Sequence, residues 1–353
     1  MRRGALLVTL AWLWAGPAGA VIVSAGDGTG NTAAPADDFG FLSAGSQAGA
    51  TAVHLGGGWV LTANHVGTGN PTFAGVSYGV VAGSTVQLHN GDGSLADLRI
   101  FRVNPIPPLP ALQIYPSAPA RNSDVVMIGR GRDRGAATSW SGYTGWLYAT
   151  TQSMRWGTNR VSANNLSVVG TSAFEMSFSA TNATASEAQA ATGDSGGGVF
   201  LKSGGVWYLA GIMTAVGPYT GQPSGTALFG NYTYAAQLST YATEISGYVS
   251  KTVCNDGLDN DGDGFVDLAD PSCLDASYNN ENSACNDGID NDGDGLVDMA
   301  DPICAPGPWY TTESATPACG LGFELALLLP PLAWLRGRRA ARRGAASGAG
   351  EAA

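Results

Sequence analysis

A block of twenty residues that occurs twice constrains the fold of this chain more than any other feature. Residues 254–273 recur as residues 285–304 with 16 of 20 positions identical, and each copy begins and ends with cysteine. Residues 254–304 hold 14 of the 28 acidic residues of the chain and no lysine or arginine. Such a block repels itself and is too small to form an apolar core, so it needs cations or cross-links to fold.

The aspartates of each copy are spaced like the ligands of a calcium loop. Oxygens at loop positions 1, 3, 5, 9 and 12 and a carbonyl at position 7 can surround one hard cation, with glycine at position 6. The predicted ligands of the first copy are Asp259, Asp261, Asp263, Phe265 (carbonyl), Asp267 and Asp270; those of the second are Asp290, Asp292, Asp294, Leu296 (carbonyl), Asp298 and Asp301. The pattern resembles the loops of EF-hands, dockerins and thrombospondin type 3 repeats, with Asp instead of Glu at position 12 and no long flanking helices.

The cysteines of the two copies predict one cross-link each. Disulfides Cys254–Cys273 and Cys285–Cys304 would each close one loop in an oxidising compartment. We therefore expect two small modules within residues 251–304, held by Ca²⁺ and a disulfide. A solvated acidic linker is the alternative, but a linker does not need the same spacing twice. The sequence leaves open whether the modules bind a protein partner or only act as a spacer.

Both ends of the chain predict export and attachment. Residues 1–20 combine Arg2 and Arg3 with a short apolar run and small residues, as in a secretory signal, with a single membrane helix as the alternative. Residues 319–343 begin at the unpaired Cys319 and join an apolar run to five arginines. This segment resembles the MYXO-CTERM sorting tails of bacterial surface proteins, with a plain transmembrane anchor as the alternative. Residues 305–318 are an expected spacer, and residues 344–353 a polar tail.

Residues 21–250 have the pattern of an all-β domain. Glycine is abundant, and β-rich stretches at 51–55, 78–86 and 206–213 alternate with turn residues. Helical periodicity is convincing mainly at 234–249. This region lacks cysteine and must rely on its β core alone, for which its length is sufficient.

Within this region, Gly193-Asp194-Ser195-Gly196-Gly197 predicts an exposed nucleophile. Glycine permits a tight turn in which the backbone N–H groups of Gly193 and Ser195 converge as an oxyanion hole. A serine nucleophile also needs a base, and the chain has only 3 histidines. His65 is the candidate because it ends the segment Leu61-Thr62-Ala63-Asn64-His65, after an apolar stretch.

Leu-Thr-Ala-x-His followed by Gly-Asp-Ser-Gly-Gly resembles the trypsin or chymotrypsin family of serine proteases. Over residues 21–250 the resemblance implies two packed β-barrels with a His–Asp–Ser triad at their junction. Asp97 is the expected acid because it opens an apolar strand, while Asp92 in a turn and Asp124 in a connection are weaker candidates. Thr214 aligns with the family's serine that supports the aspartate.

The same resemblance bears on specificity and activation. By this resemblance, Gln189 takes the position of the floor of the specificity pocket, and Val216 lies in the wall of that pocket. Because Gln189 is uncharged, we expect cleavage after a neutral substrate side chain and not after Lys or Arg. In many relatives a new N-terminus pairs with the aspartate before the nucleophile, here Asp194. Signal cleavage before Val21 would create such an end, although internal donors for Asp194 are the alternative.

The sequence thus predicts a secreted or surface-attached serine endopeptidase that acts on proteins or peptides. Catalysis needs no cofactor, and Ca²⁺ belongs to the two repeats. The alternative is a catalytically inactive, calcium-dependent surface binding or adhesion protein on the same fold. Nucleic-acid binding has no support, because the arginine clusters lie in the two terminal segments.

Overall fold

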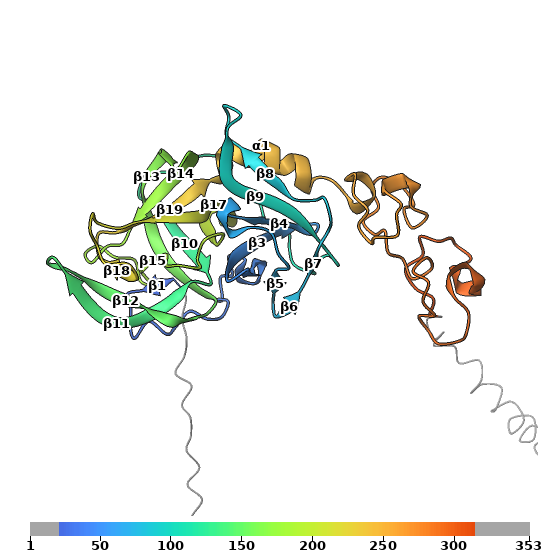
Figure 1. Ribbon diagram of the computed structural model, residues 1–353, viewed down its shortest axis with the longest axis horizontal. Coiled ribbons are helices and arrows are strands. Elements are labelled where there is room, and N and C mark those ends of the chain that lie inside the picture. Colours follow the sequence, from blue (N-terminus) through green and yellow to red (C-terminus); the bar gives the residue numbers. More distant parts are fainter. Residues whose placement is uncertain (1–20, 315–353) are drawn as a thin grey trace, which may run out of the picture. The chain divides into compact units, whose positions relative to one another are not determined.

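A computed structural model describes residues 21–314, which form two units that divide between Glu281 and Asn282 (Figure 1). The predicted signal at 1–20 and the predicted sorting segment with Cys319 lie outside the described residues. Within residues 21–314, no helix is long and apolar enough to span a membrane. The first unit contains two β-barrels and the first acidic copy, and the second unit contains the second copy.

The N-terminal barrel is an antiparallel sheet of eight strands with the order β6-β5-β2-β3-β4-β9-β7, in which β8 also pairs with β9. Its strands are β2 (Ala44–Gln47), β3 (Ala50–Gly56), β4 (Trp59–Thr62), β5 (Thr72–Phe73), β6 (Val76–Ser77), β7 (Gly79–Val80), β8 (Val86–His89) and β9 (Leu95–Asn104). The core includes Val53, Leu61, Leu98 and Ile100, which are fully buried. The expected strand at 78–86 is interrupted, because a turn at Ala82-Gly83 separates β7 from β8.

The C-terminal barrel is closed, with the strand order β10-β13-β14-β19-β17-β16. These strands are β10 (Asp124–Gly129), β13 (Arg155–Val168), β14 (Thr171–Ser177), β16 (Gly198–Ser203), β17 (Val206–Gly217) and β19 (Tyr232–Gln237). Val125, Met127, Phe174 and Val199 are among its core residues. The predicted all-β class with two barrels is confirmed.

Two smaller sheets join the C-terminal barrel. β1 (Ile22–Val23) pairs with β15 (Ala188–Gln189), so the start of the described chain is part of the fold. β11 (Arg132–Trp140), β12 (Tyr143–Gln152) and β18 (Thr226–Leu228) form a three-stranded sheet whose β11–β12 hairpin extends outward (Figure 1).

The only α-helix among the described residues is α1 (Leu238–Val249), which buries Leu238, Tyr241 and Ile245. The predicted helix at 234–249 begins too early, because Tyr234 to Gln237 belong to β19. Their backbone is paired with β14 and β17 on both sides, which is incompatible with helical hydrogen bonding.

Short 3₁₀ turns and the predicted disulfides shape the acidic copies. The turns are η3 (Val253–Asn255), η4 (Asp267–Ala269), η5 (Asp298–Ala300) and η6 (Pro302–Cys304), and the bonds are Cys254–Cys273 and Cys285–Cys304. Each copy also folds with residues beyond its second cysteine. The N–H groups of Cys254 and Cys285 donate to the carbonyls of Tyr278 and Tyr310, both at 3.1 Å. The expected boundaries at 304 and 305 therefore fall inside a folded module.

The buried His54 in β3 makes folding sensitive to acid. Among the described residues neither ring nitrogen has a hydrogen-bond partner, and burial lowers the pKa of His54 to about 4 from 6.5. The unfolded chain therefore binds this proton at a higher pH than the folded chain. The free energy of unfolding therefore falls as the pH decreases from about 6.5 towards 4, and His54 accounts for about 3 kcal/mol of this loss. Above about pH 6.5, His54 does not change the stability.

We predict that His54→Leu removes this contribution, as measured by urea unfolding at pH 7 and pH 4. The wild-type chain should lose about 3 kcal/mol more than the variant over this interval. Thr85→Ala, a change at an exposed residue without a titratable side chain, is the control and should keep the wild-type pH dependence. Equal losses in the wild type and His54→Leu would contradict the assignment.

Candidate functional site

His65 and Asp97 meet because β4 and β9 are paired strands. The 3₁₀ turn η2 (Asn64–Val66) follows β4 and presents His65, while Asp97 lies near the start of β9. His65 Nδ1 lies 2.7 Å from one carboxylate oxygen of Asp97, and the other accepts the His65 backbone N–H at 2.9 Å. This two-point contact assigns the ring proton to Nδ1 and leaves Nε2 as a proton acceptor.

The two other candidate acids have different partners. Asp92 accepts hydrogen bonds from the N–H and hydroxyl of Ser94 within its own turn. Asp124 pairs with the guanidinium of Arg160 at 2.7 Å. Asp97 is itself held by Thr171, whose hydroxyl accepts its backbone N–H at 2.8 Å. Of the three candidates, the structure brings Asp97 to His65.

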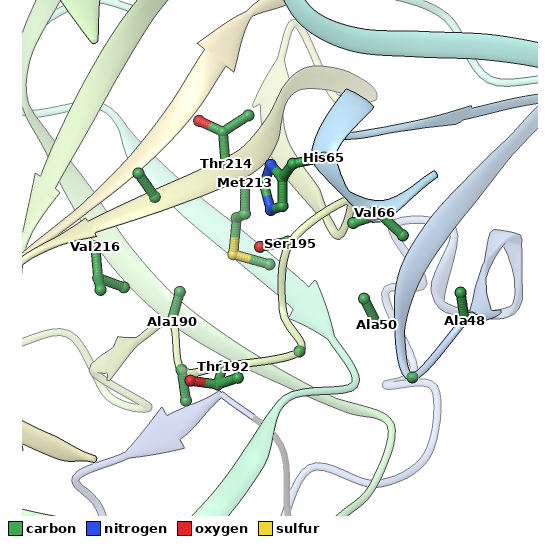
Figure 2. A pocket seen from close by; sticks show the side chains of 14 residues that line it. Ala48, Ala50, His65, Val66, Ala190, Thr192, Ser195, Met213, Thr214 and Val216 are labelled. Carbon is green, nitrogen blue, oxygen red and sulfur yellow. The ribbon is translucent and has the colours of Figure 1, made fainter. Parts of the chain in front are cut away.

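Ser195 lies in a turn between β15 and β16, and Figure 2 shows its side chain in the same cleft as His65. The Ser195 carbonyl accepts the N–H of Thr51 at 3.0 Å, which ties the loop to the other barrel. Gly193 has φ +99°, a conformation that favours glycine. Within residues 21–314, the N–H groups of Gly193 and Ser195 donate to no backbone or side-chain acceptor. Two free N–H groups beside a serine hydroxyl are the elements of an oxyanion hole.

The cleft at Ser195 has a volume of about 420 Å³ and an uncharged wall. Its lining residues are Ala48, Gly49, Ala50, His65, Val66, Ala190, Ala191, Thr192, Gly193, Ser195, Met213, Thr214, Ala215 and Val216 (Figure 2). Val216 lies in the wall of this cleft. Gln189 is not among the lining residues: it is buried in β15, paired with Ile22, so Ala190 and not Gln189 reaches the cleft. The sequence pattern also gave no indication of Ala190 or Met213.

A second cleft of about 410 Å³ lies along the other side of His65 and Asp97. Leu95 and Val169, which are largely exposed, and Val168 and Ala215 form its apolar wall. Thr214 lines both clefts, and in the second it accompanies Asp97. In the described part of the chain its hydroxyl makes no hydrogen bond to Asp97, so its supporting role stays a prediction.

Asp194 is fully buried beneath the serine loop. The backbone N–H groups of Gly131 and Ala191 each donate to its carboxylate at 2.7 Å, and the N–H of Val21 also donates to it. Burial raises the pKa of Asp194 to about 7, and the three hydrogen bonds oppose this rise. Internal donors and the residue at the expected mature N-terminus therefore contact the same carboxylate.

Each acidic copy gathers carboxylates at one point. Three side chains in each loop have oxygens within 4.8 Å of one another: Asp259, Asp261 and Asp263 in the first, and Asp290, Asp292 and Asp294 in the second. Burial, together with the neighbouring carboxylates of Asp263, Asp270 and Asp259, raises the pKa of Asp261 to about 6.

The aspartates at position 12 lie close to these clusters. Burial raises the pKa of Asp261 and of Asp292, and the charge of the nearby position-12 aspartate raises it further. Asp270 and Asp301 are 2% and 3% exposed. One oxygen of each accepts a backbone N–H, from Ser272 and Ile303, while Oδ2 of each is buried and has no hydrogen-bond partner among residues 21–314. An unsatisfied buried carboxylate oxygen beside three other carboxylates fits a hard cation. The carbonyls of Phe265 and Leu296 accept no hydrogen bond in the described chain and are available as ligands.

The aspartates at position 9 differ from the expectation. The Asp267 carboxylate accepts the N–H groups of Asp256 and Gly257 at 2.9 and 3.0 Å, and Asp298 does the same for Asp287 and Gly288 at 3.0 and 3.1 Å. These carboxylates satisfy a backbone turn and lie outside the clusters.

Sequence reasoning also missed Glu281 and Glu313. Glu281 accepts the N–H groups of Asn260 and Asp267, and Glu313 accepts those of Asn291 and Asp298. Each glutamate therefore holds its loop from outside. The motif Tyr-x-x-Glu after each copy is the signal that could have identified them.

A family match agrees with the fold. Residues 29–241 match the family described as Trypsin. The chain is similar to the solved structure of an HtrA-type protease, AlgW with a decapeptide, at 18% identity and a TM-score of 0.36. The similarity covers 57% of this chain and 51% of that chain, so this protein spans about half of that relative's length. No curated protein matches this sequence. The family match covers more than half of the chain and includes His65, Asp97 and Ser195. This protein therefore belongs to the trypsin family of serine proteases.

Proposed function

We propose that the protein is a serine endopeptidase that hydrolyses peptide bonds through an acyl-enzyme. The observation that carries this proposal is the 2.7 Å contact between His65 Nδ1 and Asp97, since His65 also lines the cleft that holds Ser195. No cofactor takes part in this chemistry.

In the proposed reaction, His65 Nε2 accepts the proton of the Ser195 hydroxyl as its oxygen attacks the substrate carbonyl. The N–H groups of Gly193 and Ser195 stabilise the oxyanion, with a contribution of about 3 kcal/mol per donor. His65 then gives the proton to the leaving amine, and a water molecule releases the acyl group by the same steps. Asp97 holds the imidazole in the required tautomer and stabilises its charged form.

The expected substrate is a protein or peptide with a neutral side chain before the cleaved bond. Ala190, Met213 and Val216 give the cleft apolar walls, and no acidic residue lines it. A lysine or arginine side chain would lose its hydration there without a counter-charge.

The proposal for the repeats is calcium binding by Asp259, Asp261, Asp263 and Asp270 and by Asp290, Asp292, Asp294 and Asp301. Three clustered carboxylates per loop and the buried, unpartnered Oδ2 of Asp270 and of Asp301 nearby support it. Bound calcium would neutralise the mutual repulsion of these groups.

Export and attachment to the cell surface remain part of the proposal. They rest on the sequence of residues 1–20 and 319–343, and Cys319 is the proposed site of processing or anchoring. The two disulfides are consistent with a compartment outside the cytosol.

A fluorophosphonate probe tests the proposed nucleophile. We predict labelling of the wild-type chain, no labelling of Ser195→Ala or His65→Ala, and a labelling rate lowered by about 10⁴-fold in Asp97→Asn, because the amide favours the wrong imidazole tautomer. Asp124→Asn is the matched control and should label normally. Absence of labelling in the folded wild type would favour the inactive binding protein.

Peptides that differ only in the residue before the cleaved bond test specificity. We predict that Ala and Leu are preferred over Lys by at least about 10-fold in kcat/KM, because the wall supplies no counter-charge. Val216→Asp should narrow this difference by binding the lysine side chain. Preferential cleavage after Lys by the wild type would contradict the proposal.

The contact between Val21 and Asp194 supports activation by signal removal. We predict that a chain beginning at Val21 labels at least about 10-fold faster than one with a single alanine before Val21, because only the free amine of Val21 can form a buried ion pair with Asp194. Circular dichroism checks that both chains are folded. Equal labelling rates would show that internal donors suffice.

A further inference from the structure

Arg102 in β9 is a fully buried arginine whose partners come from the first acidic copy. Its guanidinium donates to the Asp256 carboxylate and to the Thr252 carbonyl, the latter at 3.2 Å, and lies 5.5 Å from the centre of the Trp59 ring. Both side chains of the ion pair are 0% exposed. A buried charge without its partner is strongly destabilising. The N-terminal barrel therefore depends on this copy to satisfy Arg102.

A second contact joins the barrel to the loop itself. Asn104, also in β9, donates to the backbone carbonyl of Asn260 at 2.7 Å. Asn260 stands between the proposed ligands Asp259 and Asp261. Its side chain reaches both carboxylate oxygens of Asp256 at 3.3 Å, and its N–H donates to Glu281 at 2.8 Å. Asn260 thus connects the aspartates of the loop to Asn104 directly and to Arg102 through Asp256.

The strand that makes these contacts also carries Asp97. In the β4–β9 pairing, Trp59 lies opposite Arg102 and Thr62 opposite Arg99. Beyond Thr62 the chain continues to His65, and beyond Arg99 it continues back to Asp97. The acidic copy therefore contacts one end of a two-stranded ladder, and the catalytic pair lies at the other end, about 17 Å along the strand.

The second copy, which belongs to the other unit, repeats these internal bonds. Asn291 bonds to the Asp287 carboxylate at 3.1 Å and to Glu313 at 2.8 Å, as Asn260 does to its counterparts. Asn291 is exposed, however, and residues 282–314 contain no lysine or arginine to pair with Asp287. The two copies therefore form a matched pair in which only the first shares its unit with an arginine that pairs with its aspartate.

We infer that the first acidic copy is a calcium-dependent clamp on the catalytic strands. Binding of Ca²⁺ by Asp259, Asp261, Asp263 and Asp270 fixes Asn260 and Asp256 against Asn104 and Arg102 and so stabilises the β4–β9 ladder. The second loop binds Ca²⁺ without this effect. The inference rests on the proposed calcium binding and extends it to the protease domain.

The test uses the full chain with Ser195→Ala, which prevents self-cleavage. Isothermal titration with CaCl₂ measures binding, while thermal unfolding and hydrogen exchange of β4 and β9 measure the effect on the barrel. At a free Ca²⁺ concentration of 100 times the dissociation constant, opening of the ladder should become about 100-fold less frequent than in EDTA. The unfolding temperature of the barrels should rise by about 5 °C or more.

Two double variants separate the loops. Asp259→Asn with Asp261→Asn should abolish one binding event and the calcium-induced protection of β4 and β9. Asp290→Asn with Asp292→Asn, the matched change in the second loop, should abolish the other event and leave this protection intact. Arg102→Met should keep both binding events but lose the protection. Because Arg102→Met removes a buried charge, Asn104→Ala serves as a milder variant. For Asn104→Ala we expect a smaller calcium-induced protection of β4 and β9 than in the parent chain.

The outcomes are distinct. Calcium binding at both loops with unchanged exchange of β4 and β9 would overturn the clamp and leave the proposed calcium sites standing. Equal loss of protection in the two double variants would also overturn it. Absence of any calcium binding would overturn the proposed calcium sites and the clamp together. It would not bear on the proposed peptidase, which is tested separately by fluorophosphonate labelling of the wild-type chain.

Discussion

The antiparallel pairing of β4 with β9 is the interaction on which the site depends. It aligns the end of one strand with the start of the other, so that η2 presents His65 directly to Asp97. The two hydrogen bonds from His65 to one carboxylate are possible only in this register, since a shift by one residue would turn Asp97 to the opposite face. The serine loop is then fixed against the same barrel by Thr51, whose N–H and hydroxyl bond to the carbonyls of Ser195 and Gly193.

Much of this arrangement was predictable because the chemistry leaves few choices of residue. The glycines around Ser195, the strand before His65 and the acid that opens the next strand indicated the fold and the contact between His65 and Asp97. The cysteine spacing indicated the two disulfides, which the structure contains. These signals are local, and even the paired cysteines are only 19 positions apart.

Other features depend on contacts that no local pattern records. Gln189 occupies the expected position in the chain, yet pairing of β15 with β1 directs it away from the cleft. Asp267 has the spacing of a ligand, but its carboxylate accepts hydrogen bonds from the backbone N–H groups of Asp256 and Gly257. The start of α1 was placed four residues too early, because Tyr234 to Gln237 are periodic enough for a helix and are held in β19 by neighbouring strands.

Because Arg102 in the N-terminal barrel forms a buried pair with Asp256, the folded protease unit extends beyond residue 250, where the trypsin-like sequence ends. A fragment that stops after α1, at residue 250, would leave the guanidinium of Arg102 without the Asp256 carboxylate and the Thr252 carbonyl. The described residues up to Glu281 instead form one compact unit that contains both members of this pair. In the sequence the two acidic copies resemble a spacer that follows the protease domain. The first copy, however, contacts the N-terminal barrel through Arg102 and Asn104.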